Sequence, residues 1–310
     1  LPLKGSKENR SLIARLNFRR HWQKHLMLLP MLMIYLIFHY VPMTGIVMAF
    51  QDYLPSKGYF GSPYAGLKWF KYMFSMNNFG SVIGNTLFIS ILKLLGGLLA
   101  SVIFALLLNE LRSKHMSSMI QSCVLFPYFV SWVIIANLLK DVVSVNGVLN
   151  QTIADVFGEP IPFLTNGSWF IVLLVISSIW KGIGYDAIIL VASIASIDPA
   201  LYEAAVIDGA GRWKKMRYIT LPSIAPTIAM LLILALGGVL NAGFDQVYNL
   251  YNTSVISSAD IIDTYVFRMG INNGLYSLGT AIGLFKSIVG TILVVSSYKA
   301  ADKFAGYRIF

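Results

Sequence analysis

The chain has 310 residues, of which 56% are apolar and only 12% are charged, and its formal net charge is +10. Soluble domains carry about 25% charged residues, so the composition excludes a soluble globular protein and predicts an integral membrane protein with several spans. The positive charge does not by itself indicate a nucleic-acid partner, because membrane proteins collect Lys and Arg on their cytoplasmic side.

The N-terminal residues 1–25 form a strongly basic tail. Apolar side chains alternate irregularly with the basic ones, which fits either a short amphipathic helix on the anionic cytoplasmic leaflet or a disordered tail. The sequence begins with Leu1 rather than Met, and we therefore expect the natural chain to begin earlier.

Six long apolar segments follow the tail, and each can cross a hydrocarbon core of about 30 Å, which takes roughly 20 helical residues. We therefore expect an all-α integral membrane protein with six transmembrane helices. The predicted spans are 26–50, 81–108, 118–140, 169–195, 223–245 and 276–299. The chain is thus organised as a first helix, an aromatic-rich loop over 51–80, a core of five helices over 81–300 and a C-terminal end over 301–310.

Basic residues are distributed unevenly between the two sides of the predicted membrane. With six spans both ends of the chain lie on one side, together with the connections 109–117 and 196–222. That side holds most of the 24 Lys and Arg residues, whereas the connections on the other side hold only Lys57, Lys68, Lys71, Lys140 and Arg268. The positive-inside rule then predicts that both termini are cytoplasmic.

The connection 196–222 has a helix–turn–helix pattern. Asp198 followed by Pro199 is a typical helix start, with an Asp cap and Pro at the first helical position. The helix is expected to run to about Asp208 and to end at Gly209, which tolerates a left-handed turn. A second short helix over 212–217 should follow, before Pro222 and Pro226 break the chain ahead of the fifth span. Physical reasoning alone leaves open an ordinary amphipathic loop at the membrane surface.

The same connection carries a longer pattern, in which Glu203-Ala204-Ala205 is followed by Gly209 and, after nine more residues, by Ile219, Leu221 and Pro222. This pattern resembles the EAA motif of permease subunits in ABC importers, and Asp208 and Ala210 fit a variant common in sugar importers. In that family the segment is a coupling helix that docks into a cleft of a cytoplasmic ATPase. The resemblance therefore implies a coupling role for Glu203, Ala204, Ala205, Asp208, Gly209, Ala210, Arg212, Leu221 and Pro222.

Stretches outside this loop extend the resemblance over nearly the whole chain after residue 25. FHYVPMTGIVMAFQDY at 38–53 and GSPYAGLKWF at 61–70 look like the first-span region of permeases for polysaccharide-derived oligosaccharides, including importers of alginate and pectin fragments. NTLFIS at 85–90, LLNE at 107–110 and GLFKSIVG at 283–290 fit the same branch.

The resemblance implies a type I ABC importer permease fold, similar to the maltose permease, in the bacterial inner membrane. It also implies several partners: a second related permease in a heterodimer, two cytoplasmic ATPase subunits and an extracytoplasmic solute-binding protein. Transport would follow alternating access, in which ATP closes the ATPase dimer and the coupling helix carries that movement to the spans.

The chain lacks the patterns that its own ATP hydrolysis or catalysis would need. The phosphate-binding pattern G-x-x-x-x-G-K-[ST] does not occur, nor does any Gly-Lys pair. Neither H-E-x-x-H, G-x-S-x-G nor a metal-spaced Cys and His cluster is found. We therefore predict a transport subunit without catalytic residues, metal or cofactor, with ATP and Mg on the partner ATPases.

Three lysines fall near the middle of predicted spans, where a charge costs about 2.5–3.5 kcal/mol and needs an explanation. One interpretation is structural, with buried Lys–Asp pairs holding helices together. The other is a translocation route in which lysines and polar groups face a water-filled cavity beside aromatic rings. The candidate route residues are Lys93, Lys181, Tyr185, Asp186, Asn241, Phe244, Asp245 and Lys286. Their positive balance suits an acidic oligosaccharide.

Gly182 and Gly184 beside Lys181 permit either close helix packing, which is the default, or a local break in the pathway.

Two further functions also stay open. A permease of the same fold could serve another solute, such as amino acids or phosphate. An ion-coupled secondary transporter would use the mid-span Lys and Asp residues, although it leaves the EAA pattern unexplained. A membrane-embedded enzyme is the remotest alternative, because no catalytic constellation is found.

Overall fold

The computed structural model describes residues 22–305, with side chains over 22–299; the predicted tail up to residue 21 and the last five residues lie outside this range. The described chain is helical, with a single isolated bridge between Gln51 and Tyr64 in place of strands. Six described segments are long and apolar enough to cross a membrane: Trp22–Phe50, Phe79–Asn109, Trp132–Phe157, Gly167–Ala195, Arg212–Gly237 and Tyr276–Lys299. The predicted all-α membrane fold is confirmed.

The first of these segments includes η1 (Leu36–Tyr40), α2 (Val41–Met43) and η2 (Thr44–Phe50). The other elements follow in this order: α3 (Gly58–Gly61), α4 (Lys68–Ser75), α5 (Phe79–Asn109), α6 (Lys114–Phe129), α7 (Trp132–Val143), α8 (Val148–Phe157), α9 (Gly167–Ala195), α10 (Pro199–Ile207), α11 (Arg212–Lys215), η3 (Met216–Thr220), α12 (Leu221–Gly237), α13 (Phe244–Leu250), α14 (Ile256–Ala259), α15 (Ile262–Val266), η4 (Phe267–Asn272) and α16 (Tyr276–Ala305).

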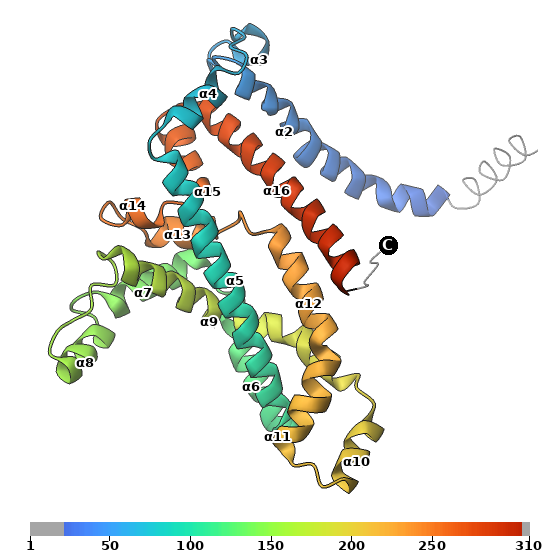
Figure 1. The fold of residues 1–310 in the computed structure, drawn as a ribbon. Coiled ribbons are helices and arrows are strands. Elements are labelled where there is room, and N and C mark those ends of the chain that lie inside the picture. The colour runs from blue at the N-terminus through green and yellow to red at the C-terminus, as the bar shows by residue number, and fades with distance from the viewer. Residues whose placement is uncertain (1–21, 306–310) are drawn as a thin grey trace, which may run out of the picture.

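Helices α5 and α9 form the centre of the fold and pack closely against each other (Figure 1). α12 contacts both of them and also α16, while α6 packs on α9. The buried side chains form three clusters, and α5 contributes to each: Phe79 and Val82 near α4, Ile89 in the middle, and Val102 and Ala105 beside α9 and α12. α5 is therefore the element around which the rest is arranged.

The helical segment Trp22–Phe50 lies at the periphery of the structure. None of the residues in its most apolar window is buried. It meets the remaining helices through η2, which packs against α16, and it diverges from α16 toward its N-terminal end (Figure 1). A helix that is apolar on all sides and unburied is suited to contact lipid or another membrane chain.

Two predicted spans are not single helices. The predicted span 118–140 is divided into α6 and α7, because Val130 adopts an extended conformation and Ser131 caps α7 by accepting a hydrogen bond from the Val133 amide at 3.1 Å. The predicted span 223–245 ends at Gly237, and residues 238–243 form a non-helical connection to α13. Hydropathy does not reveal such breaks, since the residues on both sides of them are apolar.

The predicted interruption at Pro222 and Pro226 is wrong. Helical structure is continuous from Arg212 to Gly237, through α11, η3 and α12. η3 is a π-helical turn whose last residue, Thr220, lies two positions before Pro222. Its wider turn relieves the clash that a proline ring would make with the carbonyl group one turn earlier, so the helix continues.

Gly184 permits a close approach between α9 and α6. A Cβ atom at Gly184 would lie 2.5 Å from the carbonyl oxygen of Val124, whereas one at Gly182 would meet only the Asp186 Oδ2 atom at 3.5 Å. α9 runs unbroken through both glycines, so the local break that they permit does not occur. Small residues at contacts between membrane helices let the backbones approach, which accounts for Gly184.

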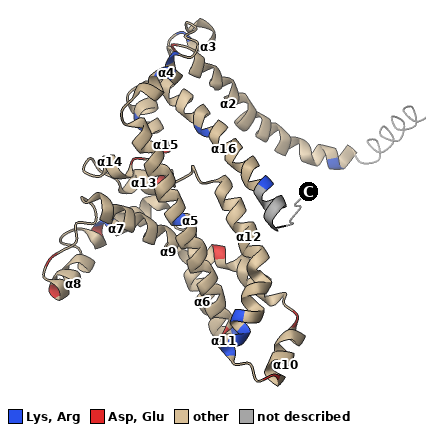
Figure 2. Ribbon diagram, in the orientation of Figure 1, with Lys and Arg blue, Asp and Glu red and all other residues tan. Residues whose placement is uncertain are grey.

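Charged residues gather at the end of the molecule that carries α10 and α11 (Figure 2). The basic residues there include Arg212, Lys214, Lys215 and Arg217, and the acidic ones include Glu203 and Asp208. Along the spans charges are sparse, and each of them has to be explained by its surroundings.

Replacing Gly184 with Ala is expected to lower the free energy of unfolding by about 1–3 kcal/mol, because the new methyl group must push α6 away from α9. The matched variant Gly182→Ala should be neutral or slightly stabilising, since its methyl group fits and Ala favours helix more than Gly. Thermal unfolding of both purified variants in detergent measures the difference. Equal unfolding temperatures would contradict the close contact between α6 and α9.

Candidate functional site

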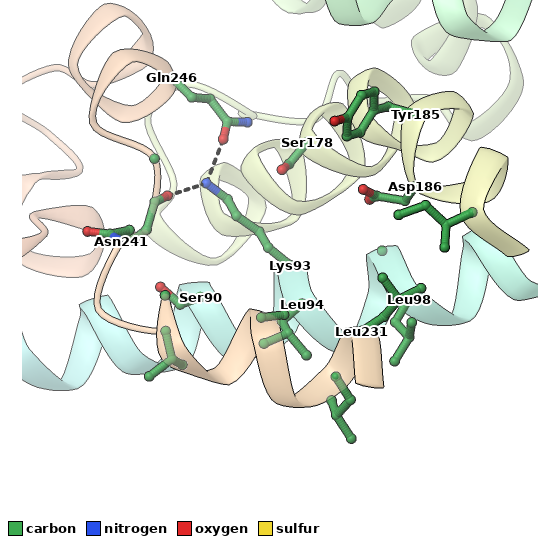
Figure 3. Close-up of a pocket in the computed structure, with 18 of the residues that line it drawn as sticks. Ser90, Lys93, Leu94, Leu98, Ser178, Tyr185, Asp186, Leu231, Asn241 and Gln246 are labelled. Atoms are coloured by element: carbon green, nitrogen blue, oxygen red, sulfur yellow. Dashed lines mark hydrogen bonds between the residues drawn. The ribbon is translucent and has the colours of Figure 1, made fainter. Parts of the chain in front are cut away.

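A cavity of about 490 Å³ lies where α5, α9 and α12 meet the non-helical segment 238–243. Its wall is largely apolar, as is usual for ligand pockets, with a few polar side chains directed to the same space. These polar residues come from α5, α9, α13 and the segment 238–243 and are Ser90, Lys93, Ser178, Tyr185, Asp186, Asn241 and Gln246 (Figure 3). Trp132 at the start of α7 adds an aromatic ring.

Lys93 extends from α5 to the segment that connects α12 with α13 (Figure 3). Its Nζ atom donates hydrogen bonds to the carbonyl oxygen of Ala242 at 2.6 Å and to the Gln246 Oε1 atom at 2.5 Å. Both acceptors are neutral, and no carboxylate of the described chain forms an ion pair with this ammonium group. Lys93 thus supplies a positive charge to the cavity wall that no ion pair of the described chain neutralises.

The Gln246 side chain, which accepts from Lys93, is itself held in place by further hydrogen bonds. It is almost fully buried, and its Nε2 atom donates to the carbonyl oxygen of Leu174 at 2.8 Å and to the Ser177 hydroxyl at 2.9 Å. Every hydrogen-bonding atom of the amide is therefore used, which keeps α13 in register with α9. The amide orientation follows from these contacts, since only Oε1 can accept from Lys93.

The wall contributed by α9 carries Tyr185 and Asp186. The Tyr185 ring stacks on Tyr128 of α6, with 4.2 Å between centroids and nearly parallel planes. The Asp186 side chain lies across the cavity from Lys93 (Figure 3), and the two groups do not form an ion pair. Opposite charges and an aromatic face thus line one space, and such a wall can hold a polar ring with both donors and acceptors.

Lys181 has a structural environment outside the cavity. Its Nζ atom donates to the carbonyl oxygens of Pro127, Tyr128 and Val130 at 3.0, 2.6 and 2.7 Å. The carbonyl groups of Tyr128 and Val130 have no backbone partner at the end of α6, where a membrane offers no water, whereas that of Pro127 also accepts from the Val130 amide at 3.2 Å. The ammonium group also lies over the rings of Tyr128 and Trp132. Lys181 therefore caps the broken helix and does not pair with Asp186.

The remaining predicted route residues also lie outside the cavity lining. Lys286 of α16 pairs with Asp263 of α15 at 2.5 Å, which is the Lys–Asp pair that the structural interpretation anticipates. Phe244 and Asp245 begin α13, where Phe244 stacks on Tyr248 with 5.2 Å between centroids. The structure therefore brings Lys93, Tyr185, Asp186 and Asn241 together in the cavity and separates the other four from it.

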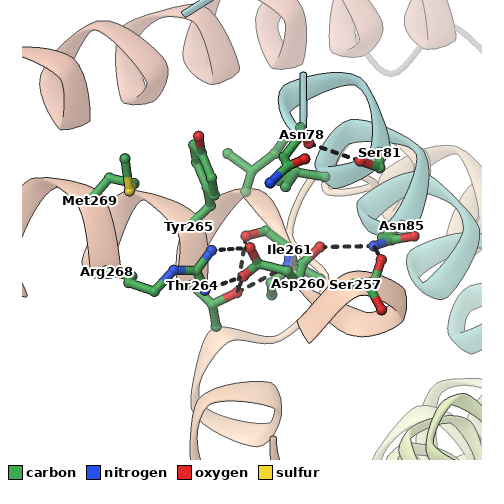
Figure 4. Close-up of polar contacts among 12 residues, drawn as sticks. Asn78, Ser81, Asn85, Ser257, Asp260, Ile261, Thr264, Tyr265, Arg268 and Met269 are labelled. Carbon is green, nitrogen blue, oxygen red and sulfur yellow. Dashed lines mark hydrogen bonds and ion pairs between the residues drawn. The ribbon is translucent and has the colours of Figure 1, made fainter. Parts of the chain in front are cut away.

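A buried polar network fastens the segment before α15 to α5 (Figure 4). Arg268 contacts both carboxylate oxygens of Asp260, and the Thr264 hydroxyl donates to the same carboxylate at 2.8 Å. Asn85 of α5 donates to the carbonyl oxygen of Ser257 at 3.1 Å. Because Asp260 is only 3% exposed, this compensation is required for its burial, and the network holds the segment that follows α13 in place.

The residues of the EAA pattern lie on and after α10, at the charged end of the molecule. The Asp198 side chain accepts from the Ala200 amide at 2.9 Å, so the helix starts as the sequence predicts. Its last residue is Ile207, and Gly209 follows in the turn with a φ of +72°. None of the residues of α10 is buried, although its apolar side chains include Val206 and Ile207, which is 87% exposed. An exposed apolar helix of this kind is suited to contact another protein.

Two side-chain contacts connect this loop to the spans. The hydroxyl groups of Tyr202 in α10 and Thr220 in η3 are hydrogen-bonded at 2.9 Å, and Thr220 is buried. Arg212 lies 3.8 Å from the Glu110 carboxylate at the end of α5, on an exposed surface where such a pair contributes little stability. Tyr202 is thus the firmer link between α10 and the long helix that contains α12.

Sequence analysis did not identify Ser90, Ser178 or Trp132 as cavity residues. Ser90 stands three residues before Lys93, and residues at this spacing share one face of a helix. A small polar residue one turn from a mid-span lysine would have been the signal. Trp132 comes to the cavity only because α7 starts anew after the break at Val130 and Ser131, which hydropathy did not reveal.

Sequence comparison identifies a family described as binding-protein-dependent transport system inner membrane components, which matches residues 97–305. Two relatives from Bacillus subtilis (strain 168) are similar over 92% of this chain. Protein LplB is 45% identical over 90% of its own length. The polygalacturonan/rhamnogalacturonan transport system permease protein YteP is 42% identical over 89% of its length.

Structure comparison gives two similar chains from bacterial alginate ABC transporters. One belongs to a transporter involved in the import of the acidic polysaccharide alginate, with a TM-score of 0.86, 37% identity and coverage of 94% of this chain and 99% of that chain. The other belongs to a transporter in complex with an alginate pentasaccharide-bound periplasmic protein, with a TM-score of 0.84, 38% identity and coverage of 93% and 96%.

Replacing Lys181 with Met is expected to lower the free energy of unfolding by about 1–3 kcal/mol or more, because it leaves carbonyl groups at the end of α6 unpaired. Lys71→Met, on the exposed face of α4, removes the same charge without such partners and serves as the control. Thermal unfolding in detergent compares them. Since Lys181 lies outside the cavity, the folded Lys181→Met protein should keep the sugar preference of the wild type, and an altered preference would contradict the capping role.

Proposed function

Because the chain belongs to the family of binding-protein-dependent transport system inner membrane components, we propose that it moves acidic oligosaccharides into the bacterial cytoplasm by alternating access. The chain is a transmembrane permease subunit of ABC importers for oligosaccharides, as its sugar-transporting relatives and the alginate transporter structures indicate. The substrate would be a uronate-containing fragment of the alginate or pectin type.

The cavity at the break between α12 and α13 is the observation that carries this proposal. It joins an ammonium group, a carboxylate and aromatic rings in one space, and sugars bind through hydrogen bonds beside aromatic faces. Lys93 offers a positive charge to an acidic sugar. The printed names of the relatives point in the same direction, since polygalacturonan and alginate are both acidic polysaccharides.

Energy for transport would come from partner subunits. The chain has no phosphate-binding pattern, so ATP and Mg would be held by two cytoplasmic ATPase subunits, with no catalytic residue or cofactor in this chain. The unburied helix α10 and the turn at Gly209 would dock on one of them. The α10 end and both termini would then face the cytoplasm, in agreement with the basic residues on α11 and η3.

Two further partners complete the proposed importer. One is a second related permease in a heterodimer, which would cover the open side of the cavity. The other is an extracytoplasmic solute-binding protein, and the complex of the alginate transporter with its periplasmic protein is the precedent. The peripheral segment Trp22–Phe50, whose most apolar window has no buried residue, offers apolar surface for lipid or for the second permease.

Gentle purification of this chain from its native membrane, followed by mass spectrometry, is expected to bring along an ATPase with a P-loop and a second six-span permease. The purified assembly in liposomes should then import uronate oligosaccharides in response to ATP and a loaded binding protein, and neutral maltooligosaccharides poorly. A chain that comes out alone and transports under an ion gradient would instead support a secondary transporter. Equal import of neutral sugars would remove the acidic substrate class.

Replacing Gly209 with Asp is expected to reduce ATP-dependent uptake by roughly tenfold, because a side chain at φ +72° strains the turn that positions α10. Gly211→Asp is the matched control. It adds the same charge two residues later, where φ is −70° and where Asp is a favoured cap for α11. Uptake and ATP hydrolysis are measured in liposomes with equal amounts of assembled complex, and normal uptake by Gly209→Asp would remove the coupling assignment.

A further inference from the structure

Lys93 retains an unused hydrogen-bond donor. An ammonium group has three N–H donors, and two of them are taken by the Ala242 carbonyl and the Gln246 side chain. The third has no partner among the described residues. Because Lys93 lines the cavity, a ligand there can accept this third hydrogen bond without displacing the other two.

Ser90 supplies a second unpartnered donor in the lining of the same cavity. The residue is only 6% exposed, and its buried Oγ atom has no hydrogen-bond partner among the described residues. A buried hydroxyl group without a partner costs stability, and native structures rarely keep one without a reason. Ser90 stands one helical turn before Lys93 on α5, and both line the cavity.

A comparison within α5 shows why Ser90 is informative. Ser101 is also buried with an unpartnered hydroxyl, but it does not line the cavity, and no charged group accompanies it there. Ser90 combines a free hydroxyl, a cavity and an ammonium group one turn away. These three features together describe an incomplete binding site and not only a packing defect.

The chemistry of these donors selects one class of ligand group. A neutral hydroxyl group can accept one hydrogen bond but leaves the charge of Lys93 unbalanced. A carboxylate has two oxygen atoms, so it can accept from the ammonium and the serine hydroxyl together, and charge-assisted hydrogen bonds are about twice as strong as neutral ones. Asp186 on the opposite wall repels a carboxylate from that wall, and its oxygen atoms can accept hydrogen bonds from sugar hydroxyl groups.

We propose that Ser90 and Lys93 form a carboxylate subsite that selects acidic over neutral oligosaccharides inside the membrane. This inference rests on the proposed function and adds to it the residues that recognise the acidic group. The subsite fixes the orientation of a uronate residue, with its carboxylate toward α5 and its hydroxyl groups toward Asp186 on α9.

A matched pair of substrates tests the subsite. Uronate oligosaccharides are compared with the same oligosaccharides after chemical reduction of their carboxyl groups to alcohols, so chain length and linkage are unchanged. Uptake is measured with the assembled importer in liposomes, and the ratio of acidic to reduced sugar is the readout. The same binding protein is used throughout, so a change in this ratio between variants belongs to this chain.

Ser90→Ala is expected to reduce the ratio about two- to tenfold, and Lys93→Gln about tenfold or more, while Lys93→Arg keeps most of it because the charge remains. Ser101→Ala, the control on the same helix, should leave the ratio unchanged. Ser90→Ala should not lower the unfolding temperature, since its hydroxyl has no partner in the protein.

Other outcomes would overturn the subsite. An unchanged ratio in both Ser90→Ala and Lys93→Gln would do so while leaving the importer itself intact. A ratio that falls equally in Ser101→Ala would assign the effect to general packing of α5. If the wild type imports the reduced sugar and the acidic sugar equally, the acidic class and the subsite fail together, whereas import of neither sugar contradicts the proposed function.

Discussion

A helix that ends inside a membrane protein leaves backbone carbonyl groups with neither water nor helix to bind, and this constraint determines where two lysines lie. α6 ends at Phe129 and α12 at Gly237, before the chain resumes in α7 and α13. Lys181 donates to three carbonyl oxygens at the first break, and Lys93 to that of Ala242 at the second. The cost of placing a charge in a span is offset because each ammonium group satisfies backbone acceptors that have few other donors.

The continuous helix from Arg212 to Gly237 connects the two functional ends of the chain. Its 26 residues extend about 39 Å at 1.5 Å per residue, from the turn after α10 to the break that borders the cavity. A break at Pro222 would have divided this element, and the π-helical turn η3 prevents it. Because Thr220 in that turn is hydrogen-bonded to Tyr202 of α10, displacement of α10 acts directly on the base of this helix.

The sequence predicted the elements that depend on composition and short local signals. Long apolar segments predicted the all-α membrane fold, although the third candidate span is Trp132–Phe157 and not 118–140. Asp198, Pro199 and Gly209 predicted where α10 begins and ends, since capping and left-handed turns are local properties. The breaks within α6–α7 and after α12 were not predicted, because Val130 and the segment 238–243 are apolar or small and hydropathy averages over them. The prediction that Pro222 breaks the helix was wrong, because the π turn before it changes which carbonyl group the proline ring meets.

The candidate site was predictable only in part, because a mid-span lysine in a sequence does not reveal what it faces. Lys93, Lys181 and Lys286 have the same residue type and similar positions within their predicted spans, yet one lines a cavity, one caps a helix and one pairs with Asp263. Their roles depend on where neighbouring chains break or carry a carboxylate, which are tertiary properties. Ser90 escaped notice because a serine in an apolar helix is ordinary until its hydroxyl is seen to lack a partner.

The position of Lys93 connects substrate selection with helix movement. One of its acceptors, the carbonyl of Ala242, belongs to the segment that continues α12. The other, Gln246, is tied to α9 through Leu174 and Ser177. Any displacement of α12 relative to α9 would therefore stretch one of these two hydrogen bonds and change the direction of the third N–H group. If α12 and α9 shift relative to each other during transport, this charge would bind an acidic group in one arrangement and release it in the other, which is the differential affinity that alternating access requires.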